Sequence, residues 1–417
     1  MRLYHSISRI NRPLVGLALS LLVPSTMIVD KLWGLVAVAA YIAVASLALF
    51  AGYKYFFKIF LSRVTEKGVF WLTLATLLFL LLIFLAAYPT VNAGVVGPGD
   101  DTEDALNGGV GELLNGHYPY RAETYAGNPV GTMPGALLLA IPFVLLGNSA
   151  YQNFFWLFMF FLSMKSYLKD GRLALLMLWV MLALSPDVLR NLVTGDDKLA
   201  NSVYVLLFIM WMVSNIPRPH HSSWIKLSSA ILLGIALSSR ANFVLLLPLV
   251  FSTLVQSAGW KPATKYTAVT CVSFCAVTAP FYLYDPQGFG PRVTADKLGQ
   301  FQPLIPSTDI VIPLGIILPL LTAVIALMLS KESMSRNLPV LFRNCAIVQA
   351  FPVLCAVVLD SIMTAHVDLL YFRYGIFFLF FGAVASWTML FRGQDDSIKK
   401  TQPRVVNSSE QSGTNLT

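Results

Sequence analysis

Apolar runs separated by short polar segments occupy most of the chain. Thirteen such runs lie at about 13–30, 32–52, 69–89, 134–147, 150–166, 173–186, 199–215, 224–239, 241–257, 266–284, 310–329, 344–362 and 370–391. A helix of about 20 apolar residues is long enough to cross a bilayer. The pattern therefore predicts an all-α polytopic membrane protein with about 12 transmembrane helices, within a range of about 11 to 13.

Two of the runs, 134–147 and 173–186, are shorter than a standard crossing. The first opens with Pro134-Gly135 and is the expected half-span. If it turns back, the inner loops collect 21 of the 29 Lys and Arg residues, whereas thirteen crossings would leave 13 inside and 16 outside. Because cytoplasmic loops are rich in Lys and Arg, we expect twelve crossings with both termini cytoplasmic. An alternative, in which 134–147 crosses and 173–186 does not, keeps the same outer loops.

The composition excludes a soluble globular protein and an intrinsically disordered one. Apolar residues make up 56% of the 417 positions and charged residues 12%, about half the charged share of a soluble domain. We therefore expect one membrane-embedded domain over residues 1–392 and a disordered cytoplasmic tail over 393–417. The net charge of +8 is spread through the short loops, so it indicates topology and not nucleic-acid binding.

Acidic residues concentrate in the predicted outer loops, which are 90–133, 187–198 and 285–309. Of the 21 Asp and Glu residues, 15 lie on the predicted outer side of the membrane: 12 in these three loops, and Asp30, Asp360 and Asp368 in shorter ones. The longest loop contains four of them within five positions: Asp100, Asp101, Glu103 and Asp104. Clustered carboxylates repel one another, and the low dielectric at a membrane edge raises a carboxylate pKa toward that of a working base. A solvated acidic loop is the alternative interpretation.

A short helix follows the acidic cluster. Its apolar residues recur at helical spacing over 103–117, at Leu106, Val110, Leu113 and Leu114, and Gly116 supplies a stop. The pattern predicts an amphipathic helix in the membrane interface, with its apolar face toward the membrane.

These motifs together resemble a known family. An acidic residue just outside an early span is followed by a helix ending Leu113-Leu114-Asn115-Gly116-His117-Tyr118-Pro119-Tyr120, a glycine-containing loop and Pro134-Gly135. This order is similar to the GT-C superfamily of membrane glycosyltransferases, and within it to the polyprenyl-phosphate-dependent, mannosyltransferase-like branch of bacteria. Three later segments fit the resemblance: Thr194-Gly195-Asp196-Asp197-Lys198, Gly234-Ile235-Ala236-Leu237-Ser238-Ser239-Arg240 and Arg373-Tyr374.

The chain also departs from the family's pattern at two positions. The family usually has Tyr-Pro-Pro-Gly where this chain has Thr132-Met133-Pro134-Gly135. Many members have proline after the basic residue, where this chain has Arg240-Ala241. Neither change removes a chemical group, so the departures concern the subfamily and not the chemistry.

The resemblance implies an inverting enzyme in the bacterial inner (plasma) membrane, with its active site on the outer face. It would move a sugar, mannose by family analogy, from a polyprenyl-phosphate donor to a glycan, lipid or protein acceptor. The base implied by the motif spacing is Asp101, with Asp100 as the second candidate. The substrate-binding residues would be Glu103, Asp104, His117, Tyr120, Arg121, Asp196, Asp197, Arg240 and Arg373.

Transfer from such a donor also needs a positive charge beside the leaving phosphate. Arg240, Arg121 and Arg373 are the candidates, and Arg240 lies between two apolar runs, where a charge is costly and usually functional. A snorkelling arginine at a helical hairpin is the alternative. Asp196 and Asp197 would orient the acceptor, hold the first-loop arginine or cap the following helix. Asp100, Asp101 and Asp104 could hold Mg²⁺ or Mn²⁺, since carboxylates suit hard cations.

Two other functions stay open on the sequence. A transporter or flippase of lipid-linked sugars would share the many spans, although gradient-coupled carriers place ionisable groups near mid-membrane, where this chain has few. A surface-polysaccharide polymerase or ligase would use a larger late loop with several arginines, whereas 285–309 has Arg292 and Lys297 as its basic residues.

Overall fold

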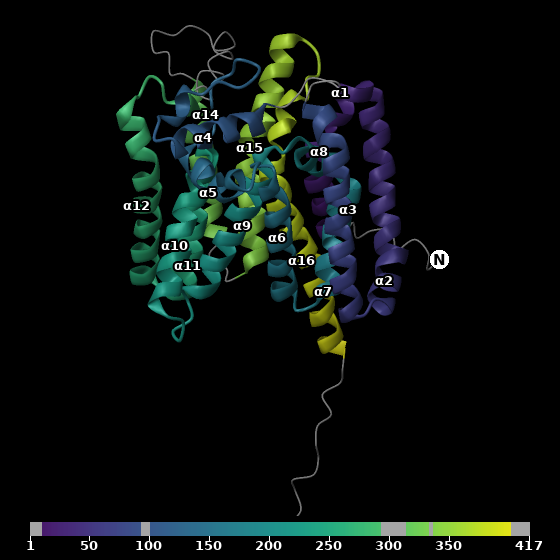
Figure 1. Cartoon of the computed structure of the whole chain (residues 1–417). Helices are drawn as coiled ribbons and strands as arrows, with labels where there is room; N and C mark the ends of the chain where they lie inside the picture. The colour runs from purple at the N-terminus through teal and green to yellow at the C-terminus, as the bar shows by residue number, and fades with distance from the viewer. Residues whose placement is uncertain (1–10, 93–100, 293–313, 333–336, 402–417) are drawn as a thin grey trace, which may run out of the picture.

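The chain folds into a bundle of helices (Figure 1). A computed structural model describes residues 11–92, 101–292, 314–332 and 337–401. Within these ranges no β-strand forms, and Glu123 and Pro129 make one isolated bridge. The elements are α1 (Arg12–Ala51), η1 (Gly52–Phe56), α2 (Phe57–Arg63), α3 (Glu66–Asn92), α4 (Thr102–Leu114), η2 (Pro119–Arg121), α5 (Pro134–Leu145), α6 (Tyr151–Leu168), α7 (Gly171–Leu184), α8 (Pro186–Thr194), α9 (Asp197–Asn215), α10 (Ser223–Leu237), η3 (Ala241–Leu246), α11 (Leu247–Ala258), α12 (Trp260–Tyr284), η4 (Gly290–Arg292), α14 (Leu314–Glu332), α15 (Leu338–Thr364), η6 (Leu370–Tyr374) and α16 (Ile376–Thr401).

The prediction of a helical membrane protein is confirmed at this level. Six helical stretches of the described residues are long and apolar enough to span a membrane: Arg12–Arg63, Glu66–Val91, Asp197–Asn215, Ala241–Ala258, Trp260–Tyr284 and Leu338–Thr364. A seventh is added if α7 and α8, which meet at 85°, count as one broken span. Four further apolar helices are shorter: Pro134–Leu145, Ser223–Leu237, Ile317–Lys331 and Ile376–Phe391.

The first of these stretches is interrupted inside α1. A straight helix over its 52 residues would be about 78 Å long, far more than the roughly 30 Å of hydrocarbon in a bilayer. At Gly34 the backbone leaves helical geometry, with φ 80° and ψ 173°, a conformation that glycine adopts without steric cost. The break lies near the start of the second predicted apolar run, 32–52, and separates most of that run from the first, 13–30.

The turns between helices gather at two opposite ends of the bundle (Figure 1). We call the end with α4 and the α8–α9 turn the acidic end, and the opposite end, with the α2–α3 and α6–α7 turns, the basic end. An ion pair across the basic end joins Lys165 to Glu66, and Arg172 donates from NH1 to the Leu61 carbonyl at 2.9 Å. The described parts of the loops 90–133, 187–198 and 285–309, which are expected outside the membrane, lie at the acidic end (Figure 1).

Helix α5 is hydrogen-bonded to neighbouring segments at its start and just beyond its end. At its start, the Gly135 backbone N–H donates to the Ser238 carbonyl at 2.9 Å. Just beyond its end, the Asn148 side chain donates to Tyr88 at 2.8 Å and the Ser149 N–H donates to Asn107 of α4 at 2.9 Å. At 12 residues, or about 18 Å, α5 is too short for a standard crossing, as the length of the run 134–147 predicts.

The predicted amphipathic helix is α4, which stops before Gly116 at φ +75°. Leu106 and Val110 on its apolar face are fully buried, whereas Leu114 is exposed. That face packs against α5 and the two tyrosines of 118–120, not against lipid as its amphipathic pattern predicts, because α5 folds back beneath it. At the far end of the chain α16 continues to Thr401, so part of the expected disordered tail is helical. Residues 402–417 lie outside the described ranges.

The close approach at the start of α5 yields a stability prediction. A methyl group on Gly135 would lie 2.1 Å from the Ile235 carbonyl oxygen, whereas one on Gly111 of α4 would meet nothing within 4 Å. Gly135→Ala is therefore expected to lower the free energy of unfolding by about 3 kcal/mol. Gly111→Ala, the control, should raise it by about 0.5–1 kcal/mol. Thermal unfolding of the purified variants measures both, and equal stability would contradict the contact.

Candidate functional site

Three segments far apart in sequence meet at the acidic end: the start of α4, the α8–α9 turn and the α10–η3 junction. Gly195 joins the first two. Its backbone is left-handed at φ +72°, and a Cβ there would lie 2.9 Å from Glu103 Cγ and 2.7 Å from Ala150 Cβ of the segment leading into α6. Glycine is therefore required both by its conformation and by the close approach of its neighbours.

The α8–α9 turn and the α10–η3 junction hold six charged side chains. They are Asp187, Arg190, Asp196, Asp197, Lys198 and Arg240, which we call the ion cluster. Its three aspartates are fully buried and Lys198 is 2% exposed. Three carboxylates and three cations balance in formal charge, which is the condition under which buried charges are tolerated.

Two chains of contacts organise the ion cluster. In the first, Asp196 Oδ2 pairs with Lys198 and lies 3.8 Å from Arg190 NH1, which is also 3.8 Å from Asp187 Oδ1. In the second, Arg240 NH2 donates to Asp197 Oδ1 at 2.5 Å. The local sequence explains the geometry, since Pro186 begins α8 and Asp196 caps α9 by accepting from the Lys198 N–H at 3.1 Å.

Asp197 thus holds Arg240 and not the first-loop arginine. Its second oxygen, Oδ2, accepts from Asn201 at 3.0 Å, and Tyr204 donates to Asn201 at 2.5 Å. Burial lowers the pKa of Arg240, but Asp197 and Asp196 raise it by more, so the guanidinium stays charged. Its Nε is buried and has no hydrogen-bond partner among the described residues.

Arg373 lies in η6, next to Tyr374. Its guanidinium carbon is 5.3 Å from the centre of the Tyr374 ring, a cation–π distance. The Nε of Arg373 is buried and, within the ranges that the structure describes, unpaired. Arg240 and Arg373 thus each keep a buried Nε without a hydrogen-bond partner among the described residues. Unused guanidinium donors of this kind suit an anionic ligand.

Asp101, the expected base, is half-buried at the N-terminus of α4. Its Oδ2 accepts from Thr124 Oγ1 at 2.7 Å and from Asn128 Nδ2 at 2.7 Å. Within the described residues, both hydrogen bonds to this carboxylate go to the same oxygen, Oδ2. Two donors fix the orientation of the group while Oδ1 stays available as an acceptor, an arrangement compatible with a base. Asp100, the second candidate, lies outside the described residues.

The two other first-loop acids have structural partners. Asp104 Oδ2 accepts from the Tyr125 backbone N–H at 2.7 Å, so Asp104 and Asp101 both hold the loop 123–129. Glu103 is 2% exposed and accepts from Asn107, which in turn accepts from the Ser149 N–H. Glu103 therefore links α4 to α6 and lies against the α8–α9 turn.

The remaining first-loop candidates, His117, Tyr120 and Arg121, follow the C-terminal end of α4. His117 is exposed and pairs with Glu112 at 3.0 Å, and Arg121 is exposed. Tyr120 is buried and donates to the Thr132 carbonyl at 3.0 Å, and burial raises the pKa of its phenol. Within the described residues, the hydrogen bonds and ion pairs of these three side chains do not involve the ion cluster.

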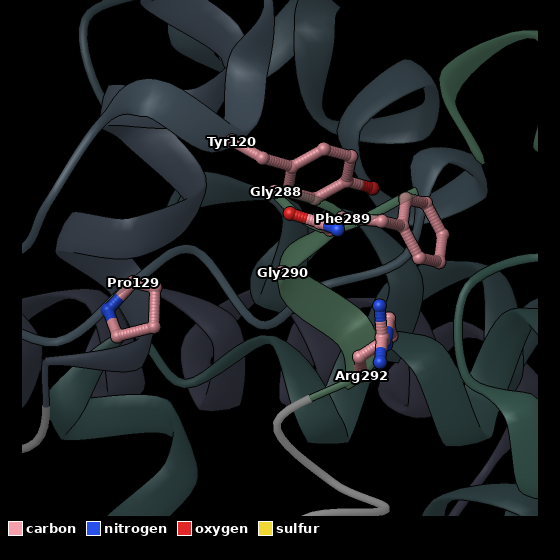
Figure 2. Close-up of a pocket in the computed structure, with 7 residues that line it drawn as sticks. Tyr120, Pro129, Gly288, Phe289, Gly290 and Arg292 are labelled. Atoms are coloured by element: carbon pink, nitrogen blue, oxygen red, sulfur yellow. The ribbon is translucent and has the colours of Figure 1, made fainter. Parts of the chain in front are cut away.

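A pocket of about 500 Å³ opens beside Tyr120. Seven residues line it: Tyr120, Pro129, Gln287, Gly288, Phe289, Gly290 and Arg292. Figure 2 shows Pro129 and Arg292 on opposite sides of the glycine segment, with the Tyr120 ring above it. The loop between α4 and α5 and the segment after α12 therefore form one surface.

Two of the three expected ligands of a divalent cation, Asp101 and Asp104, are among the described residues. In the ranges that the structure describes, no three His, Cys, Asp or Glu side chains form a group that could hold a metal ion. Asp101 and Asp104 each use Oδ2 to hold the loop 123–129, and Asp100, the third proposed ligand, is outside those ranges.

Sequence reasoning missed part of the site. It treated Arg190 and Lys198 as topology signals and gave Asp187 no role. Five charges within the twelve positions 187–198, in a chain with 12% charged residues, were the signal that could have found them. It also missed Asn153 of α6, which donates to the backbone carbonyls of Asn191 at 3.2 Å and Asp196 at 3.1 Å.

Unpaired amide groups lie close to these contacts. Among the described residues, Gln152 Nε2, Asn153 Oδ1 and Asn191 Oδ1 are buried without a hydrogen-bond partner. Buried polar groups in native proteins are nearly always paired with protein, water or ligand. The site at the acidic end thus combines acids, cations and unpaired amide groups, which suit a ligand that is both anionic and rich in hydroxyls.

The chain matches no family model, no curated protein and no solved structure.

Proposed function

We propose that the protein is an integral membrane glycosyltransferase of the GT-C type that transfers a sugar from a polyprenyl phosphate to an acceptor. The observation that carries the proposal is the ion cluster, which buries three aspartates and Lys198 and partly buries Arg190 and Arg240 at one end of the bundle, beside the acidic start of α4. Buried charges are costly and usually mark a functional site in a membrane protein. A donor with an anionic phosphate and a sugar matches the groups gathered there.

In the proposed reaction, the acceptor hydroxyl oxygen bonds to the anomeric carbon of the sugar as the bond from that carbon to the phosphate oxygen breaks. Asp101 takes the hydroxyl proton, and the polyprenyl phosphate leaves with the bonding electron pair. Attack from the face opposite the phosphate inverts the anomeric configuration. A positioned general base accelerates such a step by about 10² to 10⁴ fold.

Arg240 supplies the positive charge for the phosphate, and Arg373 is a second cation that could contribute to it. Asp197 fixes the Arg240 side chain through NH2, and the buried Nε stays available to a phosphate oxygen. A charged donor held in place before the reaction stabilises the developing negative charge without reorganisation. Asp197 thus positions the arginine in this scheme.

The donor's prenyl chain would lie among the apolar helices, with its phosphate at the acidic end. In this scheme the acidic end faces outward, both termini are cytoplasmic, and the membrane is the bacterial inner membrane. This orientation follows from the Lys and Arg residues of the predicted inner loops. Mannose is the first sugar to test, by analogy with the family that the first loop resembles.

A panel of labelled donors tests the proposal. Purified protein in liposomes is incubated with polyprenyl phosphates carrying mannose, glucose, galactose or arabinose, together with a mixture of glycan, lipid and peptide acceptors. The expected result is consumption of one donor and a new glycosidic bond of inverted configuration. Movement of a donor across the bilayer without a new bond would support a flippase and contradict the proposal, as would full recovery of every donor.

A further inference from the structure

The pocket beside Tyr120 has fixed walls. Tyr118 donates through its hydroxyl to the carbonyls of Phe281 at 2.9 Å and Asp285 at 3.2 Å, which ties the first outer loop to the end of α12. Gly290 lies so close to the loop that a Cβ there would be 1.9 Å from the Val130 carbonyl oxygen. The backbones of the two segments are therefore in contact, and these contacts fix the walls of the pocket between them.

The segment that forms the other wall is also ordered by its own side chains. Asp285 Oδ1 accepts from the backbone N–H groups of Gln287 at 3.2 Å and Gly288 at 2.9 Å. Arg292 donates from NH1 to the Pro286 carbonyl at 2.9 Å, which folds its guanidinium back over the segment. Hydrogen bonds within this turn thus fix the positions of Gln287 and Arg292 in the pocket.

The lining combines flat apolar surfaces with hydrogen-bond donors. Tyr120 and Pro129 supply rings, and Gly288 and Gly290 leave the backbone bare. The Gln287 amide and the remaining Arg292 N–H groups supply donors, and the amide oxygen supplies an acceptor. A sugar ring has the complementary surfaces, with C–H groups on its faces and hydroxyls around its edge. The volume lies in the range of small-molecule sites.

The pocket is also connected to the proposed base. Pro129 directly follows Asn128, whose side chain donates to Asp101 Oδ2 at 2.7 Å. Consecutive Cα atoms are about 3.8 Å apart, so one wall of the pocket and the carboxylate share a single short loop. A ligand that occupies the pocket therefore lies next to the loop that orients Asp101.

From this juxtaposition we infer that the pocket binds the acceptor, and that the acceptor is a carbohydrate. The inference rests on the proposed function and narrows its acceptor from glycan, lipid or protein to glycan. The donor reaches the ion cluster from the membrane, and the acceptor reaches Asp101 from the aqueous side through the pocket of residues 120–129 and 287–292.

A binding experiment tests the inference without requiring catalysis. Gln287→Cys places a thiol in the pocket of the full-length protein, which is held in lipid nanodiscs and labelled with a charged, membrane-impermeant maleimide. The four native cysteines are free, so the unmodified protein sets the background labelling. Lys31→Cys is the matched control, because Lys31 is exposed and lies in α1, far from the pocket in sequence.

Mannobiose, maltose, cellobiose, lactose and a Ser/Thr-containing peptide serve as competitors. At least one disaccharide should slow labelling of Gln287→Cys about tenfold at ten times its Kd, and should leave Lys31→Cys unchanged. Protection by the peptide alone, protection by nothing, or equal protection of both thiols would overturn the inference. Because no transfer is measured, the result is independent of the donor panel, which tests the proposed function itself.

Discussion

Asp101→Asn is expected to abolish glycosyl transfer while leaving the protein folded. The proton acceptor is lost, so transfer should fall by about 10² to 10⁴ fold. The amide oxygen can take the place of Oδ2 and still accept from Thr124 and Asn128, so the loop 123–129 keeps its contacts. Initial rates with the donor identified by the panel measure the first effect, and thermal unfolding measures the second.

Two further variants separate catalysis from loop geometry. Glu123→Gln removes an exposed acid from the same loop and should keep transfer within about twofold of the unchanged protein, since exposed charges interact weakly. Thr124→Val removes one of the two donors to Asp101 without removing the carboxylate, and should reduce transfer by less than Asp101→Asn does. Equal losses in Asp101→Asn and Thr124→Val would mean that Asp101 only holds the loop. Retained activity in Asp101→Asn would refute its role as the base.

Arg240→Ala is expected to lose transfer and also to destabilise the fold. The buried Asp197 would be left without its partner, and removing one member of a buried ion pair costs about 3–5 kcal/mol. Transfer should fall because the phosphate loses its cation. Unfolding of the purified protein and rates at saturating donor measure the two effects separately.

The double variant Asp197→Asn with Arg240→Gln tells these effects apart. Both charges are gone, so stability should return to within about 1 kcal/mol of the unchanged protein, whereas transfer should stay lost. Activity within tenfold of the unchanged protein would contradict the phosphate role. The control pair is Glu66→Gln with Lys165→Gln at the basic end, where both side chains are about half exposed at 57% and 46%. Breaking that pair should cost less than about 1 kcal/mol and leave transfer unchanged.

Local features of the fold could be predicted because their causes are local. The break in α1 falls at Gly34, near the start of the apolar run 32–52, and α4 stops before Gly116 in its left-handed conformation. The run 134–147 forms a short helix that begins at Pro134, as its length and its opening Pro134-Gly135 predict. Each of these depends on residues within a few positions of one another.

The candidate site was predictable only in part. The acidic first loop, Asp196, Asp197 and Arg240 were chosen from motif and charge, but the pairing of Asp197 with Arg240 joins residues 43 positions apart. The amphipathic pattern of α4 did not reveal that its apolar face would meet α5, because lipid and protein interiors are equally apolar. The wall of the pocket at 287–292 has no signal of its own in the sequence.

The sequence by itself determined that this chain is a helical membrane protein with an acidic and a basic set of loops, since hydropathy and charge act at each residue separately. Only the tertiary structure decided which charges meet. Asp187, Arg190, Asp196, Asp197, Lys198 and Arg240 neutralise one another because α8 bends by 85° from α7 and the α10–η3 junction lies against α9. Buried charges are stable only when opposite charges lie within a few ångströms, and that proximity exists only in the packed bundle.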